Sequence, residues 1–175
     1  MAEVHTLTFK EPALRILENE HRYLRYLMEE WHAIVRELEE WELPIEDARL
    51  QLKTLRQKLY EFIEPFKNHT DKEENFLFPK LGEYIGFEQG PIVGIQEEHQ
   101  EIEAYIGHFF HHTRGSIDQM DSEQIRTVAR DAGEAFEVLT VHFVKEETVL
   151  FPMAEKQIKA TDLDELAEKM KYLIT

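Results

Sequence analysis

Apolar residues recur along most of the chain at the three- and four-residue spacing of amphipathic helices. Stretches containing Gly or Pro divide this pattern into segments, and no segment alternates as a strand would. The predicted helices span about 11–40, 45–80, 91–113 and from 121 or 122 onward, with a short one over about 162–173. Long helices with short connections predict an all-α, antiparallel up-down-up-down four-helix bundle with a short C-terminal helix.

Each long segment has one face that we expect to form the core, and Pro65 inside the second predicts a bend there. These faces are apolar except for four His and two Glu. The expected inward residues are Leu14, Leu17, His21, Leu24, Met28 and Val35; Leu52, Leu55, Leu59, Phe62, Phe66, His69, Glu73 and Phe76; Ile92, Ile95, His99, Ile102, Ile106 and Phe110; and Ile125, Val128, Ala135, Leu139, His142, Glu146 and Val149.

Two stretches of eleven residues, 69–79 and 142–152, repeat one another 73 positions apart. They read HTDKEENFLFP and HFVKEETVLFP and are identical at seven positions, where average composition gives roughly one chance match. A weaker echo relates the NEH that ends at His21 to the EEH that ends at His99. The sequence therefore predicts an internal duplication of a helical hairpin.

The repeated stretches each hold a His and a Glu four residues apart, which places both side chains on one helix face. In a bundle with approximate two-fold symmetry, the two HxxxE pairs and the two lone histidines can meet at one buried level. Buried carboxylates are costly unless they are paired or bind cations. Two carboxylates that bridge two ions leave two imidazoles for each ion, which predicts a dinuclear metal centre. The expected ligands are His21, His69, Glu73, His99, His142 and Glu146.

The donor set limits which metal this centre takes. The chain has no cysteine, which excludes thiolate ligands, disulfides and a cysteine nucleophile. Calcium and magnesium prefer cages of oxygen atoms, whereas mixed imidazole and carboxylate sites suit transition metals. We therefore expect iron, with manganese or zinc as alternatives.

Composition and charge limit the domain organisation and the classes of binding partner that we expect. The 175 residues suit a single domain, expected over 1–175 with its core over about 12–156. A net charge of −16 argues against nucleic acid, which needs clustered Lys and Arg. No run approaches the about 20 apolar residues of a membrane span, and the N-terminus lacks a signal-like pattern. A soluble cytoplasmic protein, either monomer or homodimer, is the expectation.

The order of these motifs, from about Leu14 to Lys156, resembles the hemerythrin-like, or HHE cation-binding, domain family. The resemblance rests on a lone His, HxxxE followed by LFP, a third-helix His, and a second HxxxE with LFP. It implies that the four histidines are terminal ligands and that Glu73 and Glu146 bridge two irons sharing an oxo or hydroxo group. It also implies that the partner is a small diatomic molecule, O₂ or NO.

The sequence departs from the oxygen-carrying members of that family in two ways. They have a fifth His four residues after the third-helix His, where this chain has Glu103, and they usually space the last His and acid by five residues instead of four. Glu103 shares a helix face with His99 and is a candidate terminal ligand; the alternative is that it turns toward Arg25 or a lysine. The four-His, two-Glu pattern is more similar to bacterial iron–sulfur-repair di-iron proteins, although these carry a cysteine module.

Several other polar residues have simpler interpretations. Glu74 and Glu147 lie about 140° round the helix from the repeated histidines, so we expect them to face solvent. Lys72 and Lys145 are expected to be solvated or ion-paired. His32 is about 16 Å along the helix from His21, too far to join its site. The expected surface histidines are His108, His111 and His112.

The C-terminal helix has an apolar edge formed by Leu163, Leu166, Met170 and Leu173. We expect this edge either to pack on the bundle or to form a dimer contact.

Two functions share this ligand set. The first is a module that binds or senses O₂ or NO through a di-iron centre, and the second is a di-iron enzyme or iron-handling protein acting in peroxide or NO chemistry or iron donation. A ferritin-like oxidase needs two ExxH motifs, but only Glu18 to His21 fits, because Gln96 stands at the matching position. A metal-free adaptor bundle leaves the duplicated ligands unexplained.

Overall fold

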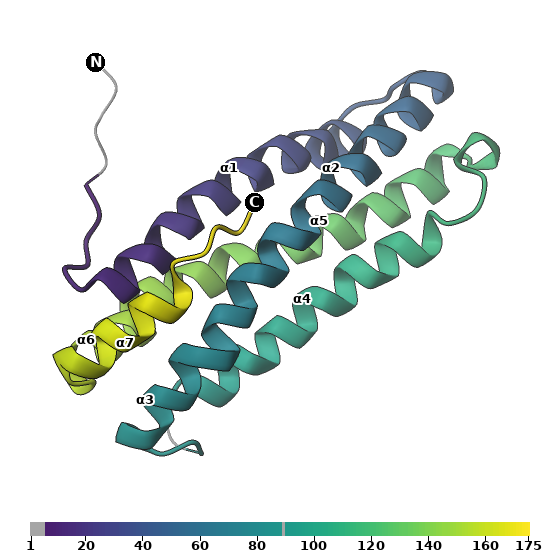
Figure 1. Ribbon diagram of the computed structural model, residues 1–175. Coiled ribbons are helices and arrows are strands. Elements are labelled where there is room, and N and C mark those ends of the chain that lie inside the picture. The colour runs from purple at the N-terminus through teal and green to yellow at the C-terminus, as the bar shows by residue number, and fades with distance from the viewer. Residues whose placement is uncertain (1–5, 89) are drawn as a thin grey trace.

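Four long helices run side by side and form the body of the computed structural model, which describes residues 6–88 and 90–175 (Figure 1). Contacts join the first helix to the second and the third to the fourth, and they also join the first to the fourth and the second to the third. The described residues contain no strand, so the predicted all-α antiparallel bundle is confirmed. The four helices are α1 (Pro12–Glu40), α2 (Ile45–Lys72), α4 (Ile92–His112) and α5 (Ser122–Lys145).

Local sequence signals account for the helix ends. Pro12 occupies the first turn of α1, where its missing N–H costs nothing. A short 3₁₀ turn, η2 (Ile117–Gln119), precedes α5, which begins with a capping box in which the Asp121 side chain accepts from the Gln124 N–H and the Gln124 side chain accepts from the Asp121 N–H. No described helix is long and apolar enough to cross a membrane.

The second and fourth long helices both continue through a π-helical turn. α2 passes into η1 (Glu73–Leu77) and then α3 (Phe78–Ile85), and α5 passes into η3 (Glu146–Leu150) and then α6 (Phe151–Gln157). The helical segment thus extends to 85, beyond the predicted end at 80. Gly86, at φ 89°, ends it with a backbone conformation that favours glycine. A π turn holds one more residue than an α turn, and such turns are frequent at functional sites.

Each π turn changes which residues face the core beyond it. Val149, expected inward, is exposed, and Leu150 is buried in its place. Phe76 is likewise only half-buried, while Leu77 is fully buried. Those two expectations were wrong because a constant α-helical period was carried across the extra residue.

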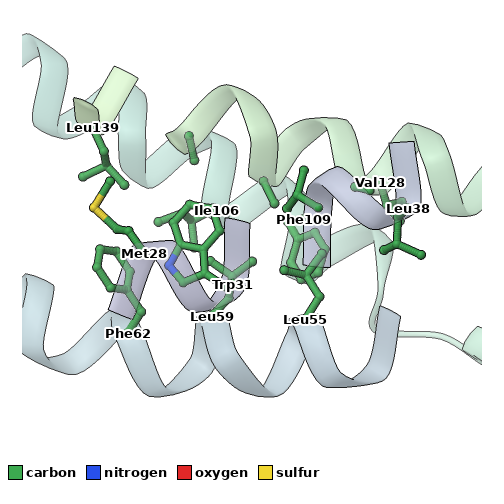
Figure 2. Close-up of a cluster of buried hydrophobic side chains, with 14 of the residues drawn as sticks. Met28, Trp31, Leu38, Leu55, Leu59, Phe62, Ile106, Phe109, Val128 and Leu139 are labelled. Atoms are coloured by element: carbon green, nitrogen blue, oxygen red, sulfur yellow. The ribbon is translucent and has the colours of Figure 1, made fainter. Parts of the chain in front are cut away.

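Two clusters of buried apolar side chains fill the bundle on either side of a polar level. The larger lies toward the α1–α2 connection, where Trp31 packs among residues of all four long helices (Figure 2). The smaller, which includes Leu17, Leu77, Ile95 and Leu150, lies toward α3 and α6. On α1 the two clusters end at Leu17 and Leu24, so the level between them is that of His21.

The C-terminal helix α7 (Ala160–Met170) packs against α1 and η1, as one of the two predicted arrangements required. Leu163, Leu166 and Met170 are buried. The helix ends before Leu173, which is exposed, and Ile174 is buried instead. After α7 the chain turns back along the bundle and ends near the middle of α1 and α2 (Figure 1). The tail therefore covers one side of the polar level.

Candidate metal centre

Six ionisable side chains meet at the polar level between the two apolar clusters. All six are buried, which is rare for His and Glu unless they are paired or bind a cation. Each of the four long helices contributes one His, and the two π turns each begin with a Glu. The structure thus brings together His21, His69, Glu73, His99, His142 and Glu146, the set expected from the duplicated motif.

These side chains form two groups that share both carboxylates. His21 and His69 form the first group with Glu73 and Glu146, and His99 and His142 form the second with the same two residues. The potential ligand atoms within each group lie within 4.8 Å of one another. These are the only such groups found among residues 6–88 and 90–175. The arrangement offers two adjacent metal positions, each with two imidazoles and two shared carboxylates.

Each of the four histidines donates its Nδ1–H to a glutamate outside the two groups. A carboxylate only accepts hydrogen bonds, so this contact fixes the Nδ1–H form and leaves the Nε2 lone pair directed into the centre. The four contacts are His21 to Glu147 (2.9 Å), His69 to Glu20 (2.9 Å), His99 to Glu74 (2.8 Å) and His142 to Glu98 (2.9 Å).

The Nε2 atoms of the four histidines and the carboxylate oxygens of the two glutamates are arranged so that a cation between them would be favourable. The Nε2 atoms of His21 and His69 lie 3.1 Å apart, and those of His99 and His142 lie 3.0 Å apart. Two facing lone pairs repel one another unless a proton or a metal lies between them. All four carboxylate oxygens of Glu73 and Glu146 are buried without a hydrogen-bond partner in the described part of the chain. Orphaned carboxylates beside convergent imidazoles are the donor set that a divalent transition metal requires.

Cations support three of the four outer glutamates. The Arg25 guanidinium donates two hydrogen bonds, of 2.6 and 3.0 Å, to the Glu147 carboxylate. Lys72 donates to Glu20 at 2.5 Å, and Lys145 donates to Glu98. The two lysines are ion-paired, which was one of the two expectations for them. These contacts hold the carboxylates that in turn orient the histidine rings.

Glu74 and Glu147 correct a prediction made from helix angles. Both were expected to face solvent, but Glu147 is half-buried against His21 and Arg25. Glu74 is exposed as expected, yet one of its oxygens binds His99. The π turns explain this, since a wider turn brings the residue after Glu73 or Glu146 back toward the neighbouring helix.

Glu20 and Glu98 were not assigned a role from the sequence. The signal was present, because each directly precedes one of the two lone histidines in the weaker echo. Their partner is not the neighbouring His but the HxxxE histidine of the same half, His69 or His142. Only the packing of α1 against α2, and of α4 against α5, reveals that pairing.

Glu103 is not brought to the centre. It is exposed and belongs to neither group, because the residues of α4 that face inward after His99 are Ile102 and Ile106. The structure therefore gives no support to Glu103 as a terminal ligand. It lies close enough to Lys67 to help raise the pKa of that amine, after the larger effect of Asp71.

The other histidines among residues 6–88 and 90–175 lie away from the centre. His32 stacks on Phe136 with ring centroids 3.5 Å apart, at the border of the larger apolar cluster. The cluster near the end of α4 is exposed, and within it His112 contacts Asp131 at 3.4 Å. None of the four joins the two groups, as the sequence predicted.

The first histidine pair has opposed pKa shifts. Burial lowers the pKa of His21 to about 4, although Glu147 acts in the other direction. Burial also acts to lower the pKa of His69, but Glu73 and Glu20 outweigh it and raise the pKa to about 9. In the absence of metal, the pair therefore holds one proton between its two Nε2 atoms.

The second pair repeats this pattern. Against the effect of burial, Glu73 and Glu74 raise the pKa of His99, whereas burial lowers the pKa of His142 despite Glu98. Burial alone would raise the pKa of Glu73, but His69 and His99 lower it. Each metal position is thus preorganised as a site for one positive charge.

The metal-free protein should be most stable near pH 6.5. Because the folded pKa of His69 is about 9, its contribution is complete below the unfolded value of 6.5 and is lost as the pH rises through 9. Because that of His21 is about 4, stability falls as the pH drops from 6.5 to 4. Each change is on the order of 3 kcal/mol. Urea unfolding between pH 4 and 9 measures it, with His69→Gln as the control that removes the alkaline loss; a flat profile above pH 6.5 would contradict the assignment.

An open hollow of 740 Å³ lies outside the Arg25–Glu147 pair. Thr8, Phe9 and Tyr26 also line it. His21 is not among its lining residues and is fully buried. The Arg25–Glu147 pair therefore forms the wall between this hollow and the first group.

Comparison with known proteins agrees with the geometry. The family profile of the hemerythrin HHE cation-binding domain matches residues 13–154, which is most of the chain. No curated protein and no solved structure matches the chain. The matched region contains all six inner residues and the four glutamates that orient the histidines. The chain therefore belongs to the hemerythrin HHE cation-binding family.

Proposed function

We propose that the chain holds two iron ions and binds O₂ or NO through them. Membership of a cation-binding family and the two His and Glu groups support metal binding in general. The number of ions is inferred from one observation, that both groups share Glu73 and Glu146. A carboxylate common to both groups would be a ligand of both ions.

The choice of iron follows from the donors and their surroundings. Each position offers two imidazoles and two carboxylates, a mixture that suits iron, manganese or zinc and not calcium or magnesium. Aromatic rings, including Phe143 and Phe151, cover the His21 side of the centre. A dry, apolar shell limits solvent access to a metal and protects a reduced one, which matters for a redox-active ion.

The protein's own residues have defined parts in this function. The four imidazoles and two carboxylates would hold the ions, and the outer glutamates would fix the rings. Iron held there would supply the reversible binding of a diatomic molecule. The apolar clusters above and below keep bulk water from the level of the ligands.

Metal analysis of iron-loaded protein should give two irons per chain. Protein made in iron-replete medium, or reconstituted anaerobically with Fe(II), is desalted and its iron is counted against protein mass. Glu134→Gln, an exposed change on α5, should leave the count at two and serves as the matched control. A reproducible count of one or none in a folded bundle would contradict the dinuclear proposal.

The second step distinguishes binding from catalysis. The loaded, reduced protein is mixed with O₂ or NO and followed by optical spectroscopy. A stable adduct that reverses on removal of the gas supports carriage or sensing. Rapid irreversible oxidation with consumption of peroxide would contradict this function and favour a di-iron enzyme.

A further inference from the structure

The two halves of the duplication match at the inner ligands but differ around them. We infer that the two metal positions are unequal: the ion held by His21 and His69 is retained, whereas the ion held by His99 and His142 exchanges readily. This inference rests on the proposed function, since it needs two ions. It identifies Arg25, a positioning residue, and other outer residues as the source of the difference.

The first difference is the support of the glutamate that orients the lone histidine. Glu147, which accepts from His21, also accepts two hydrogen bonds from Arg25, and the Glu147 side chain is 24% exposed. Glu74 holds His99 in the equivalent way but is 41% exposed. The position equivalent to Arg25, four residues after the lone histidine, is Glu103. A second carboxylate there cannot hold Glu74 as an arginine would.

The second difference concerns the lysines that support the other two outer glutamates. Lys72 is fully buried against Glu20, and the C-terminal tail covers it: the Tyr172 carbonyl accepts from its Nζ, and the Tyr172 ring lies 4.3 Å away. Its equivalent, Lys145, is 52% exposed beside Glu98. An ion pair in a low-dielectric setting is stronger than an exposed one, which contributes little.

The third difference is the packing of the lone histidine ring. His21 stacks on Phe143 at 4.2 Å between centroids, and the Arg25 guanidinium lies 5.5 Å from the centroid of the Phe143 ring. The repeat places Thr70 where the other half has Phe143. His99 keeps a looser stack, with Phe78 at 6.0 Å.

All three differences favour retention of the ion held by His21 and His69. A metal leaves when its imidazoles turn away, and a ring is harder to turn when its Nδ1–H is held by a charge-supported carboxylate and its face is covered. All three supports are present around the first group, whereas the second group has only the exposed Lys145 and the looser stack of His99 on Phe78. Loss of an outer partner typically weakens metal binding by about 10- to 100-fold. The two ions should therefore differ by at least about tenfold in release rate.

The test is the release of Fe(II) to an excess of the chelator ferrozine, under anaerobic conditions. Protein loaded with two irons per chain should lose them in two phases of equal amplitude. Lys72→Met and Arg25→Gln should each accelerate the slow phase by about tenfold. Their counterparts in the other half, Lys145→Met and Glu103→Gln, should leave the slow phase unchanged.

A gain-of-support variant makes the test independent of any loss of folding. Glu103→Arg, at an exposed position, should slow the fast phase by supplying Glu74 with the cation that Glu147 already has. The metal-free melting temperature of every variant is measured alongside. An iron count below two before chelator is added overturns the proposed function and this inference together. A count of two followed by a single phase, or by equal effects of Lys72→Met and Lys145→Met, overturns the inference alone.

Discussion

Iron loading is expected to raise the melting temperature of the protein by about 8 to 16 °C. Metal bound only by the folded state adds about 4 kcal/mol when free metal exceeds the dissociation constant a thousandfold. Each kcal/mol shifts the melting temperature of a chain of this size by about 2 to 4 °C. The structural reason is that Glu73 and Glu146 keep four carboxylate oxygens without a hydrogen-bond partner among the described residues, and metal satisfies them.

Differential scanning calorimetry of metal-free and loaded protein measures this shift. Magnesium at the same concentration is the control, because it does not favour imidazole ligands. Superimposed melting curves with and without iron would show that the buried carboxylates do not bind it.

The substitution Glu146→Gln is expected to have opposite effects on the two forms of the protein. In the metal-free form the Glu146 carboxylate lies 3.3 and 3.0 Å from Nε2 of His21 and His142 and has no hydrogen-bond partner among the described residues. Replacing this buried carboxylate, which lacks hydrogen bonds, by a neutral amide should stabilise that form by about 1 to 3 kcal/mol. The same change removes a carboxylate that, under the proposed function, is a ligand of both ions, so the stabilisation by iron should largely disappear.

Paired unfolding curves with and without iron measure both effects on one protein. Glu134→Gln on the same helical segment removes the same charge at an exposed position and should change neither form. If Glu146→Gln destabilised the metal-free protein and retained the full response to iron, Glu146 would be a structural residue and not a ligand.

The helices and the convergence of the six inner side chains could be predicted because each rests on a local rule. Helical periodicity identified the buried face of α1 from Leu14 to Val35, and breaks at Gly and Pro separated the segments. The duplicated HxxxE motif identified the inner residues, since two Glu side chains within apolar stripes are costly to bury unless a cation joins them. Family membership then agreed with both.

The positions of the residues around the six inner side chains could not be predicted from helical periodicity. The π turns displaced Val149 outward and turned Glu147 toward His21, and nothing in the local sequence marks an added residue in a helix. The role of Glu20 depends on how α1 packs against α2. The spacing of Glu103 from His99 predicted that the two residues share a helix face. It could not show that Glu103 lies at the exposed edge of that face.

The π turns also restrict how the length of this chain can vary. Removing one residue from Glu73–Leu77 would restore a regular α-helix, and everything after it in α3 would rotate by about 100°. Leu77 and Phe78 would then leave the smaller apolar cluster, and Glu74 would turn away from His99. Single-residue deletions in these two segments should therefore be far less tolerated than deletions in the connections. An idealised bundle with the same motif on unbroken helices would keep Glu20 and Glu98 beside His69 and His142, but His21 and His99 would lose the glutamates that orient them.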